Sequence, residues 1–386
     1  MRSFFGYERS DGRAGVRNHV VVLPSVSCAN GVVSAIARAV PGVVPLLHGH
    51  GCGRGGRDLE LHARTLIGIA RHPNVAAVLV IGLGCEVIKA EFLAPAIAEG
   101  GAPVECLSIQ AEGGSVSAAR KGAAVAEALL ARARADVRTE IDINRLVLGL
   151  ECGGSDAFSG VTANPAVGLV ADRVVESGGT VLLTENTEMI GTSHILARRA
   201  ASPEVAEKVV AMVDAAERRT HEILGPLASM VIAPGNMDGG MSSIREKALG
   251  SVAKGGASPV SAVIDYAEAP GCRGLILMDA PGYDTESMTG LVAAGAQAIL
   301  FTTGRGNPIG FPTVPVIKIA TTTRLYESMR DDMDVNAGVV LEGATLEDVR
   351  DDILGVLARA LGGEQTKAER NAQDGIVCMF TTGPSF

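Results

Sequence analysis

Residues 145–165, RLVLGLECGGSDAFSGVTANP, contain the transition that decides the fold of this chain. The first seven residues, RLVLGLE, contain an apolar run that predicts a β-strand, and small and polar residues follow at once. The Asn164–Pro165 pair then predicts the start of a helix. A continuously apolar strand is typical of a parallel sheet covered on both faces. The stretch therefore predicts one strand–loop–helix unit of an α/β fold.

The same alternation recurs along the chain. Apolar, β-branched runs predict strands over 19–25, 42–48, 75–83, 103–109, 145–151, 179–185, 229–234, 273–280, 296–303 and 313–321. Ala-rich segments predict helices over 29–39, 116–135, 165–177, 203–223 and 344–361. Strands separated by helices indicate βαβ units and a doubly wound sheet. Because a long helix ends near residue 136, we predict a Rossmann-like parallel-sheet domain over 1–138 and a larger α/β domain over 145–386.

The composition excludes several classes of protein. The chain has 386 residues, of which 47% are hydrophobic and 20% are charged, and its formal net charge is −9. An acidic chain without a basic cluster is not expected to bind nucleic acid. No apolar run reaches the roughly 18 residues that a membrane span needs, and the N-terminus has no signal-peptide pattern. We therefore expect a cytoplasmic enzyme without a membrane association, and a homo-oligomer.

Four of the seven cysteines directly follow predicted strands. A single cysteine is most often a small buried hydrophobic residue, but the carboxyl ends of parallel strands meet at one edge of a sheet. Thiolates there suit iron or zinc, either as a catalytic ion or as a cluster held by three thiolates. The predicted metal ligands are Cys28, Cys52, Cys85 and Cys152. The other three cysteines are assigned to packing: Cys106, Cys272 and Cys378.

Other strand ends carry candidate catalytic and substrate-binding groups. His48 ends the second predicted strand, and Glu185 ends the strand over 179–185. Arg305 lies in the Gly-rich turn FTTGRGNPIG, where it suits a substrate carboxylate. Lys318 lies inside an apolar strand, and a buried lysine is costly unless it is paired or tuned for chemistry.

Two further observations concern the histidines of a predicted helix and the motifs of common enzyme classes. His62 and His72 lie in the helix-like stretch DLELHARTLIGIARHPN, where a capping or surface role is expected. The chain has no G-x-G-x-x-G turn with a downstream acid, no P-loop and no G-x-S-x-G elbow. Enzymes of the NAD-dependent, ATP-dependent and serine-hydrolase classes are therefore not supported.

Several long motifs occur in an order that resembles the altronate and galactarate dehydratase family. They cover residues from about 6 to 340 and include GYERSDGRAGVRN, ECGGSDAFSGVTANPAVG, EKALGSVAKGG, MDAPGYDTESMTG, FTTGRGNPIG and DMDVNAG. The resemblance implies a lyase that dehydrates a sugar acid to a 2-keto-3-deoxy acid, aided by a divalent metal, iron (Fe²⁺) or manganese. Such chemistry removes a proton beside a carboxylate and stabilises the resulting enediolate with positive charge.

The resemblance also suggests roles for particular residues. Candidates for catalysis are Glu185, Lys318 and His48 as the base, together with Asp156, which follows Cys152 closely. Candidates for substrate binding are Arg17, Asn164, Arg305 and Asn307.

Fused members of the family carry a small SAF-type domain ahead of the region matched here, and this chain starts directly at the following motif. A separate small SAF-domain subunit is therefore an expected partner. Two alternatives stay open: the large subunit of a (2R)-sulfolactate sulfo-lyase, because eliminating sulfite needs the same proton abstraction, and a non-catalytic sugar-acid-binding protein. GHGCG and GLGCE favour the sugar-acid branch over the sulfo-lyase, and the dense polar strand ends favour an enzyme.

Overall fold

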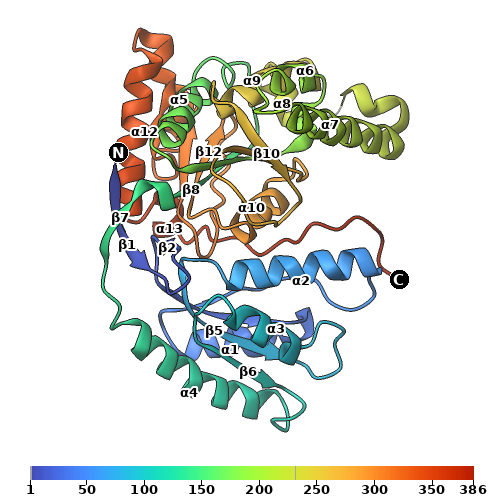
Figure 1. The fold of residues 1–386 in the computed structure, drawn as a ribbon, viewed down its shortest axis with the longest axis vertical. Helices are drawn as coiled ribbons and strands as arrows, with labels where there is room; N and C mark the ends of the chain where they lie inside the picture. The colour runs from blue at the N-terminus through green and yellow to red at the C-terminus, as the bar shows by residue number, and fades with distance from the viewer. Residues whose placement is uncertain (1, 231) are drawn as a thin grey trace.

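The fold contains two fully parallel β-sheets, each covered by helices on both faces (Figure 1). It is a computed structural model that describes residues 2–230 and 232–386, without the side chains of residues 229 and 230. The α/β fold class predicted from the sequence is confirmed. In the described residues, no helix is both long and apolar enough to span a membrane.

The first sheet has the strand order β4-β3-β5-β6, and its helices lie on both faces. Its strands are β3 (His19–Pro24), β4 (Val43–Pro45), β5 (Val75–Gly82) and β6 (Val104–Ser108). Its helices are α1 (Asn30–Ala39), α2 (Gly56–Ala70), α3 (Ala90–Ala98) and α4 (Ser115–Ala133), with the short 3-10 helix η1 (Ser27–Ala29) before α1. Apolar residues of α1 and α4 pack together on one face, whereas α2 and α3 cover the other. Every residue of β5 is buried, as expected for a strand covered on both sides.

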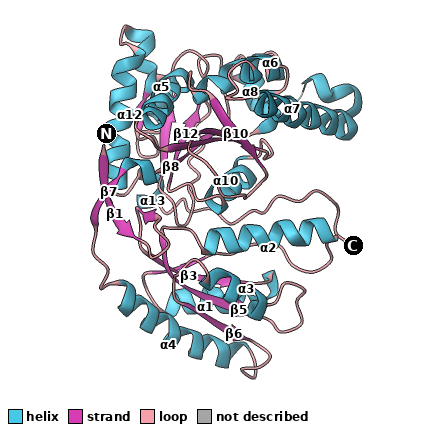
Figure 2. Cartoon of the chain, viewed as in Figure 1, coloured by secondary structure: helices cyan, strands magenta, loops and turns pink. Residues whose placement is uncertain are grey.

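The second sheet has the strand order β10-β11-β9-β8-β12-β13-β14, again entirely parallel. Its strands are β8 (Val147–Cys152), β9 (Thr180–Leu183), β10 (Val260–Ile264), β11 (Gly274–Met278), β12 (Ala298–Thr303), β13 (Val316–Ala320) and β14 (Val335–Asn336). Helices α5 (Ala163–Glu176) and α12 (Leu346–Leu361) cover one face, and α10 (Asp284–Ala293) covers the other (Figure 2).

Shorter elements complete this part of the chain. The α-helices are α6 (Ser193–Ala197), α7 (Pro203–Leu224), α8 (Pro234–Asp238), α9 (Ile244–Ser251), α11 (Thr323–Ser328) and α13 (Lys367–Arg370). The 3-10 helices are η2 (Ile143–Arg145), η3 (Asn186–Met189), η4 (Gly225–Met230), η5 (Val252–Gly255) and η6 (Ala337–Glu342). A small antiparallel sheet of order β2-β1-β7 joins β1 (Ser3–Glu8), β2 (Ala14–Gly15) and β7 (Thr139–Asp142).

A shared apolar core joins the two parallel sheets. Helix α2 of the first sheet packs on α10 of the second, and buried residues of both helices belong to one cluster. At Gly68 the two helices approach so closely that an added Cβ would collide with the backbone carbonyl of Ala293. The close approach depends on glycine, because any larger residue would push α2 away from α10.

The C-terminal tail also connects the two sheets, since it leaves the second sheet and runs beside α2 (Figure 1). The N–H of Val377 donates to the carbonyl of Leu47 at 3.1 Å. Further on, the carboxylate of Asp58 in α2 accepts hydrogen bonds from the N–H groups of Thr382 at 2.7 Å and Gly383 at 3.1 Å. The tail is therefore held to the first sheet by backbone groups rather than by apolar packing alone.

The structure agrees with most of the strands and helices predicted from the sequence. The predicted strand over 229–234 is wrong: residues 229 and 230 belong to η4, and Pro234 begins α8, whereas Val231 lies outside the described residues. The paired strands β1 and β7 were not predicted, because neither contains a long continuous apolar run. The surface role expected for His62 and His72 is also wrong, since each side chain is about 1% exposed. The division into domains 1–138 and 145–386 remains a prediction.

We predict that Gly68→Ala weakens the contact between α2 and α10. The free energy of unfolding is expected to fall by about 1–3 kcal/mol, because the new methyl group meets a backbone atom that cannot rotate away. Gly56→Ala, at the start of the same helix, is the matched control because an added Cβ there meets nothing within 4 Å. The control is expected to be unchanged or stabilised by up to about 1 kcal/mol. Equal urea midpoints for the two variants would contradict this account.

His72 makes the stability of this contact depend on pH. Its Nδ1 accepts the N–H of Asn74 at 3.0 Å, so Nε2 carries the proton and donates to the carbonyl of Ala296 at 2.9 Å. Burial lowers the pKa of His72 to about 3, so the ring is neutral in the folded chain at pH 5. The unfolded chain takes up a proton below its ordinary pKa of about 6.5, so stability falls as the pH falls from 6.5 towards 3.

The variant His72→Gln tests this coupling. At pH 7.5 it is expected to be less stable than the parent chain, because a buried hydrogen bond is lost. At pH 5 the difference is expected to shrink by about 2 kcal/mol, because the variant has no imidazole to protonate on unfolding. Urea unfolding at both pH values measures this change. A difference that does not vary with pH would show that His72 is not the titrating group.

Candidate active site at the carboxyl edge of the seven-stranded sheet

Acidic and basic side chains converge where β8, β9 and β11 end. Strands β8 and β9 are parallel neighbours, and β11 lies next to β9, so their carboxyl ends lie at the same edge. Glu151 and Cys152 end β8, Glu185 follows β9, and Asp284 begins α10 after β11. Ligands of parallel α/β sheets bind beyond this edge, which makes it the expected position of an active site.

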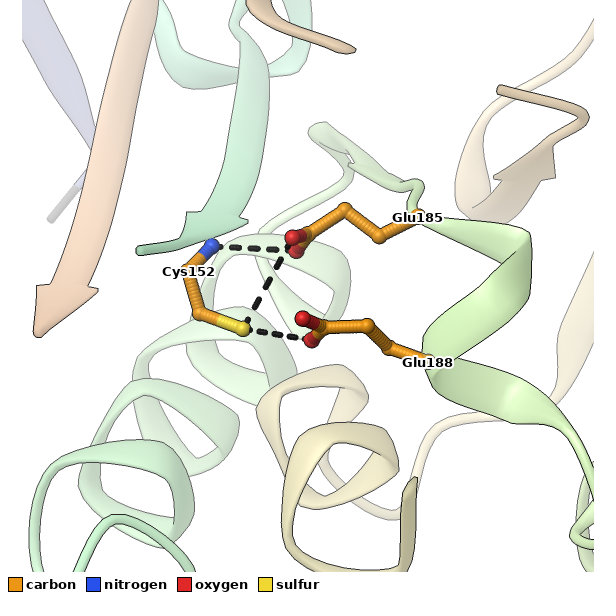
Figure 3. Close-up of side chains that lie close together, drawn as sticks. All are labelled: Cys152, Glu185 and Glu188. Atoms are coloured by element: carbon orange, nitrogen blue, oxygen red, sulfur yellow. Dashed lines mark hydrogen bonds between the residues drawn. The ribbon is translucent and has the colours of Figure 1, made fainter. Parts of the chain in front are cut away.

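Cys152, Glu185 and Glu188 form the first buried group (Figure 3). The Glu185 carboxylate accepts the backbone N–H of Cys152 at 3.0 Å, and the Cys152 thiol donates to Glu188 at 2.6 Å. Burial and the two carboxylates raise the pKa of the Cys152 thiol well above its ordinary value. Cys152 is therefore a protonated hydrogen-bond donor in this arrangement. Glu185 adopts a left-handed φ of 69°, which is uncommon for a residue other than glycine.

Two lysines neutralise these carboxylates. The Lys254 ammonium, which is fully buried, lies 2.7 Å from Glu185 and 3.8 Å from Glu188. Lys247 forms a second ion pair with Glu188. Burial opposes ionisation of Glu188, but Lys247 and Lys254 outweigh it, so the pKa of Glu188 lies below its ordinary value. For Glu185, burial and the charge of Glu188 raise the pKa to about 7.

Glu151, Glu185 and Asp284 form a second group that shares Glu185 with the first. Ser287 donates to one oxygen of Glu151 at 2.6 Å, while the other oxygen is buried and has no hydrogen-bond partner among the described residues. Burial, with the charge of Glu185, raises the pKa of Glu151 well above its ordinary value. This group, unlike the first, includes a carboxylate oxygen without a partner.

Lys318 lies on β13 and completes the set of buried charges. Its ammonium lies 3.2 Å from the centroid of the Phe301 ring, and its nitrogen has no hydrogen-bond partner among the described residues. Burial lowers the pKa of Lys318 to about 7, although Asp284 and Glu151 act in the opposite direction. A buried amine with a pKa near 7 can be either charged or neutral near neutral pH.

A cleft of about 640 Å³ opens beside these groups. Its polar lining includes Glu188, Lys247, Asn236 and Asp284, and its apolar wall comes mostly from the region of η4. The volume lies in the range of small-molecule sites. A small molecule in this cleft would therefore meet one lysine and two carboxylates.

The predicted catalytic residues occupy different positions. Glu185 and Lys318 belong to this region, but His48 lies in the first sheet, where the backbone groups of Pro24 and His50 occupy both of its ring nitrogens. Asp156 is buried and accepts hydroxyl hydrogens from Ser159 at 2.9 Å and Thr321 at 2.8 Å. These bonds indicate that Asp156 holds its loop in place. Its catalytic role stays a prediction.

The predicted substrate-binding residues are mostly engaged by the protein itself. Arg17 pairs with Glu369 at 2.8 Å and also donates to two backbone carbonyls near the end of α12. Asn164 links Thr302 to the carbonyl of Gly250. Asn307 donates to Asp284 at 2.6 Å, so it positions a carboxylate of the cleft. Arg305, in contrast, is exposed and free to meet a ligand.

The four predicted metal-ligating thiols do not form one group. Cys152 is buried at the second sheet, whereas the other three are exposed in loops of the first sheet: Cys28, Cys52 and Cys85. Among the described residues, no set of three metal-ligating atoms within 4.8 Å of one another includes any of these three thiols.

Sequence reasoning did not select the two lysines that neutralise the site. Lys247 and Lys254 lie in the motif EKALGSVAKGG, seven residues apart, and therefore on one face of α9 and the turn that follows it. That spacing, beside an otherwise small and apolar segment, is the signal that could have identified them. Glu151 and Asp284 likewise follow the strand-end rule that identified Glu185.

Comparisons with known proteins relate the whole chain to one family of dehydratases. A family model described as D-galactarate/Altronate dehydratase, C-terminal, matches residues 143–384, and one described as D-galactarate dehydratase/Altronate hydrolase, second domain, matches residues 6–134. An altronate dehydratase of Bacillus subtilis is 37% identical over 382 residues, which cover 96% of this chain and 76% of that protein.

Two further relatives differ in name and in length. A (2R)-sulfolactate sulfo-lyase subunit beta of Chromohalobacter salexigens is 38% identical over 375 residues, and 95% of each chain is covered. A galactarate dehydratase (L-threo-forming) of Escherichia coli is 36% identical over 373 residues, which cover 90% of this chain and 70% of that protein.

We predict that Lys254→Met strongly destabilises the chain. The variant leaves Glu185 and Glu188 buried with one positive charge fewer, and breaking a buried ion pair in this way costs about 3–5 kcal/mol. The exposed Lys208→Met on α7 is the matched control and should change the free energy of unfolding by less than about 0.5 kcal/mol. If urea denaturation shows the same stability for both variants, Lys254 does not neutralise the site.

Proposed function

The chain belongs to the D-galactarate/altronate dehydratase family, and from this membership we propose that it dehydrates a sugar acid of the altronate or galactarate type to a 2-keto-3-deoxy sugar acid. As a member of a family named for dehydration, it is a carbon–oxygen lyase. The observation that supports the proposal is the buried Lys318, whose nitrogen has no hydrogen-bond partner among the described residues and whose charge interacts with Glu151 and Asp284.

We propose that Glu151, Glu185 and Asp284 hold the divalent metal, Fe²⁺ or Mn²⁺. One oxygen atom from each of these carboxylates lies within 4.8 Å of the others, and Glu151 offers a buried oxygen that lacks a partner among the described residues. Carboxylate oxygens suit manganese and similar hard cations. When bound, such an ion supplies positive charge that stabilises an enediolate beside the substrate carboxylate.

The group of Cys152, Glu185 and Glu188 fits a metal less well. Lys247 and Lys254 already bring two positive charges to its two carboxylates, and the thiol is a donor to Glu188 rather than a thiolate. A further cation there would be repelled by both ammonium groups. A metal site that includes Cys152 is therefore the alternative to the site formed by Glu151, Glu185 and Asp284.

Elemental analysis separates the two metal sites. Glu151→Gln is expected to lower the Mn²⁺ or Fe²⁺ content of anaerobically purified chain at least tenfold, the range in which a removed ligand acts. Cys152→Ser, which keeps a small donor beside Glu188, is expected to leave the metal content unchanged. Loss of metal in the cysteine variant and not in the glutamate variant would place the ion at Cys152 instead.

Lys318 is the proposed general base. It takes the proton from the carbon next to the substrate carboxylate, the C–O bond at the neighbouring carbon breaks, and the hydroxyl group leaves as water after gaining a proton. The enol that remains then rearranges to the keto acid. A buried amine that has no hydrogen-bond partner among the described residues can accept this proton more readily than Glu185, which is bound to Cys152 and Lys254.

Lys247, Asn236 and Arg305 are the groups proposed to bind the anionic substrate. Lys247 and Asn236 line the cleft, and Lys247 is about 12% exposed, so its ammonium can be reached from solvent. Arg305 lies close to Gly154 of the cleft wall and is exposed. Their positive and amide groups suit the carboxylates and hydroxyls of a sugar acid.

Lys318→Met tests the assignment of the base. Dehydration is expected to slow by at least about 100-fold, the contribution of a positioned general base. Exchange of the substrate α-proton with deuterated water should be lost in parallel, because proton removal precedes loss of the hydroxyl. The exposed Lys208→Met serves as the control. A variant that keeps α-proton exchange would exclude Lys318 as the base.

We further propose that the chain works with a second, smaller subunit, and that the assembly is a homo-oligomer of this unit. A relative that this chain matches over 95% of both lengths is named as a subunit beta. The same relative supports the alternative activity, elimination of sulfite from (2R)-sulfolactate. The buried charged groups of the site speak against a protein that only binds its ligand.

The decisive experiment measures product formation by the anaerobic chain with Fe²⁺ or Mn²⁺, alone and with a co-expressed small subunit. Altronate, galactarate and (2R)-sulfolactate are supplied separately. A 2-keto-3-deoxy acid from either sugar acid supports the proposal. Sulfite release from sulfolactate, with no keto acid from the sugar acids, would establish the alternative.

A further inference from the structure

Three exposed thiols lie at one edge of the first sheet, away from the site described above. Cys28 lies in η1 after β3, Cys52 in the loop after β4, and Cys85 in the loop after β5. These three strands are adjacent in the order β4-β3-β5 and are parallel. Neighbouring strands lie about 4.8 Å apart, so the three strand ends span roughly 10 Å.

Direct hydrogen bonds hold the three loops to one another. The N–H of Ser27 donates to the carbonyl of His50 at 2.9 Å, which joins the Cys28 and Cys52 loops. Ser25 donates to Glu86 at 2.7 Å, which joins the Cys28 and Cys85 loops. Glu86 in turn accepts the N–H of Gly84 at 2.6 Å. The thiols are therefore carried by one connected frame rather than by independent loops.

A helix begins shortly after each thiol. Helices α1, α2 and α3 follow Cys28, Cys52 and Cys85, and the side chain of the N-cap residue makes no capping hydrogen bond in any of the three. At the start of α3, the Glu86 carboxylate accepts a hydrogen bond from the backbone of Ala90. The free N–H groups and the positive end of the helix dipole favour negative charge near each start. Three such starts lie beside the three thiols and favour an anionic group between them.

Exposure of these thiols also needs an explanation, because cysteine is among the most buried residue types. Cys106 and Cys272 are exposed as well, but Cys106 lies within β6 and Cys272 precedes β11 of the other sheet. Neither belongs to the connected frame. They serve below as matched controls.

We propose that Cys28, Cys52 and Cys85 hold an iron–sulfur cluster with one iron that receives no thiolate from this chain. A single zinc ion would need thiolates within about 4.6 Å, twice the zinc–sulfur bond length. No set of three ligating atoms within 4.8 Å includes these thiols in the described part of the chain. Thiolates of a cluster bind different irons and therefore stand farther apart. This site is separate from the carboxylates at the second sheet.

Anaerobic reconstitution with Fe²⁺ and sulfide tests the site in the full chain. About four iron and four sulfide ions per chain are expected, with a broad visible absorption band and, after reduction, a paramagnetic signal. Cys28→Ser, Cys52→Ser and Cys85→Ser should each lower the sulfide content several-fold. Cys106→Ser and Cys272→Ser should leave it unchanged, and Cys152→Ser should also leave it unchanged.

Mass spectrometry after alkylation gives a second measurement that needs no variant. In the reconstituted chain, Cys28, Cys52 and Cys85 should be protected from iodoacetamide, while Cys106 and Cys272 react. Iron uptake without sulfide, equal sulfide loss in the control variants, or alkylation of all five thiols would overturn the proposal. Because sulfide content and alkylation are measured without substrate, this outcome is independent of whether the chain dehydrates sugar acids.

Discussion

The buried ion pair between Lys254 and Glu185 is the interaction on which the second sheet's site depends. Two charges are taken out of water at this point, which is costly unless each finds a close partner. At 2.7 Å the pair meets that condition, and the backbone N–H of Cys152 adds a further hydrogen bond to Glu185. These contacts also hold Glu185 at a φ of 69°, a conformation that an unconstrained glutamate avoids. The pair thus connects the ends of β8 and β9 with η5.

Around this pair, the structure divides the buried charges into two groups with different properties. Lys247 and Lys254 pair with Glu188 and with one oxygen of Glu185, so the group around Cys152 is the more fully paired of the two. Glu151 and Asp284, by contrast, interact with a Lys318 whose nitrogen has no hydrogen-bond partner among the described residues. These two carboxylates have no lysine ion pair among the described residues, and they therefore suit a bound cation beside an amine that can transfer a proton. The proposed dehydration, which builds negative charge beside a carboxylate, would use both.

The sequence predicted the fold well where the apolar pattern is continuous. Strands such as β5 and β13 are buried along their whole length, so composition alone identifies them. It failed over residues 229–234, where an apolar run follows a long helix and continues as helical turns. It also failed for His72, because its partner, the carbonyl of Ala296, is 224 residues away and no local pattern reports it.

The sequence alone determined three features: the parallel α/β class, the strand ends that carry polar groups and the family resemblance. Each of these depends only on which residues follow one another along the chain. Tertiary structure decided which of those groups meet. Cys152 lies apart from Cys28, Cys52 and Cys85, because its strand belongs to a different sheet. Lys247 and Lys254 reach Glu185 and Glu188 across about 60 residues of chain, as the intervening helices fold back over the sheet. Buried ion pairs depend on the distances between side chains in the folded chain, and the sequence does not specify these distances directly.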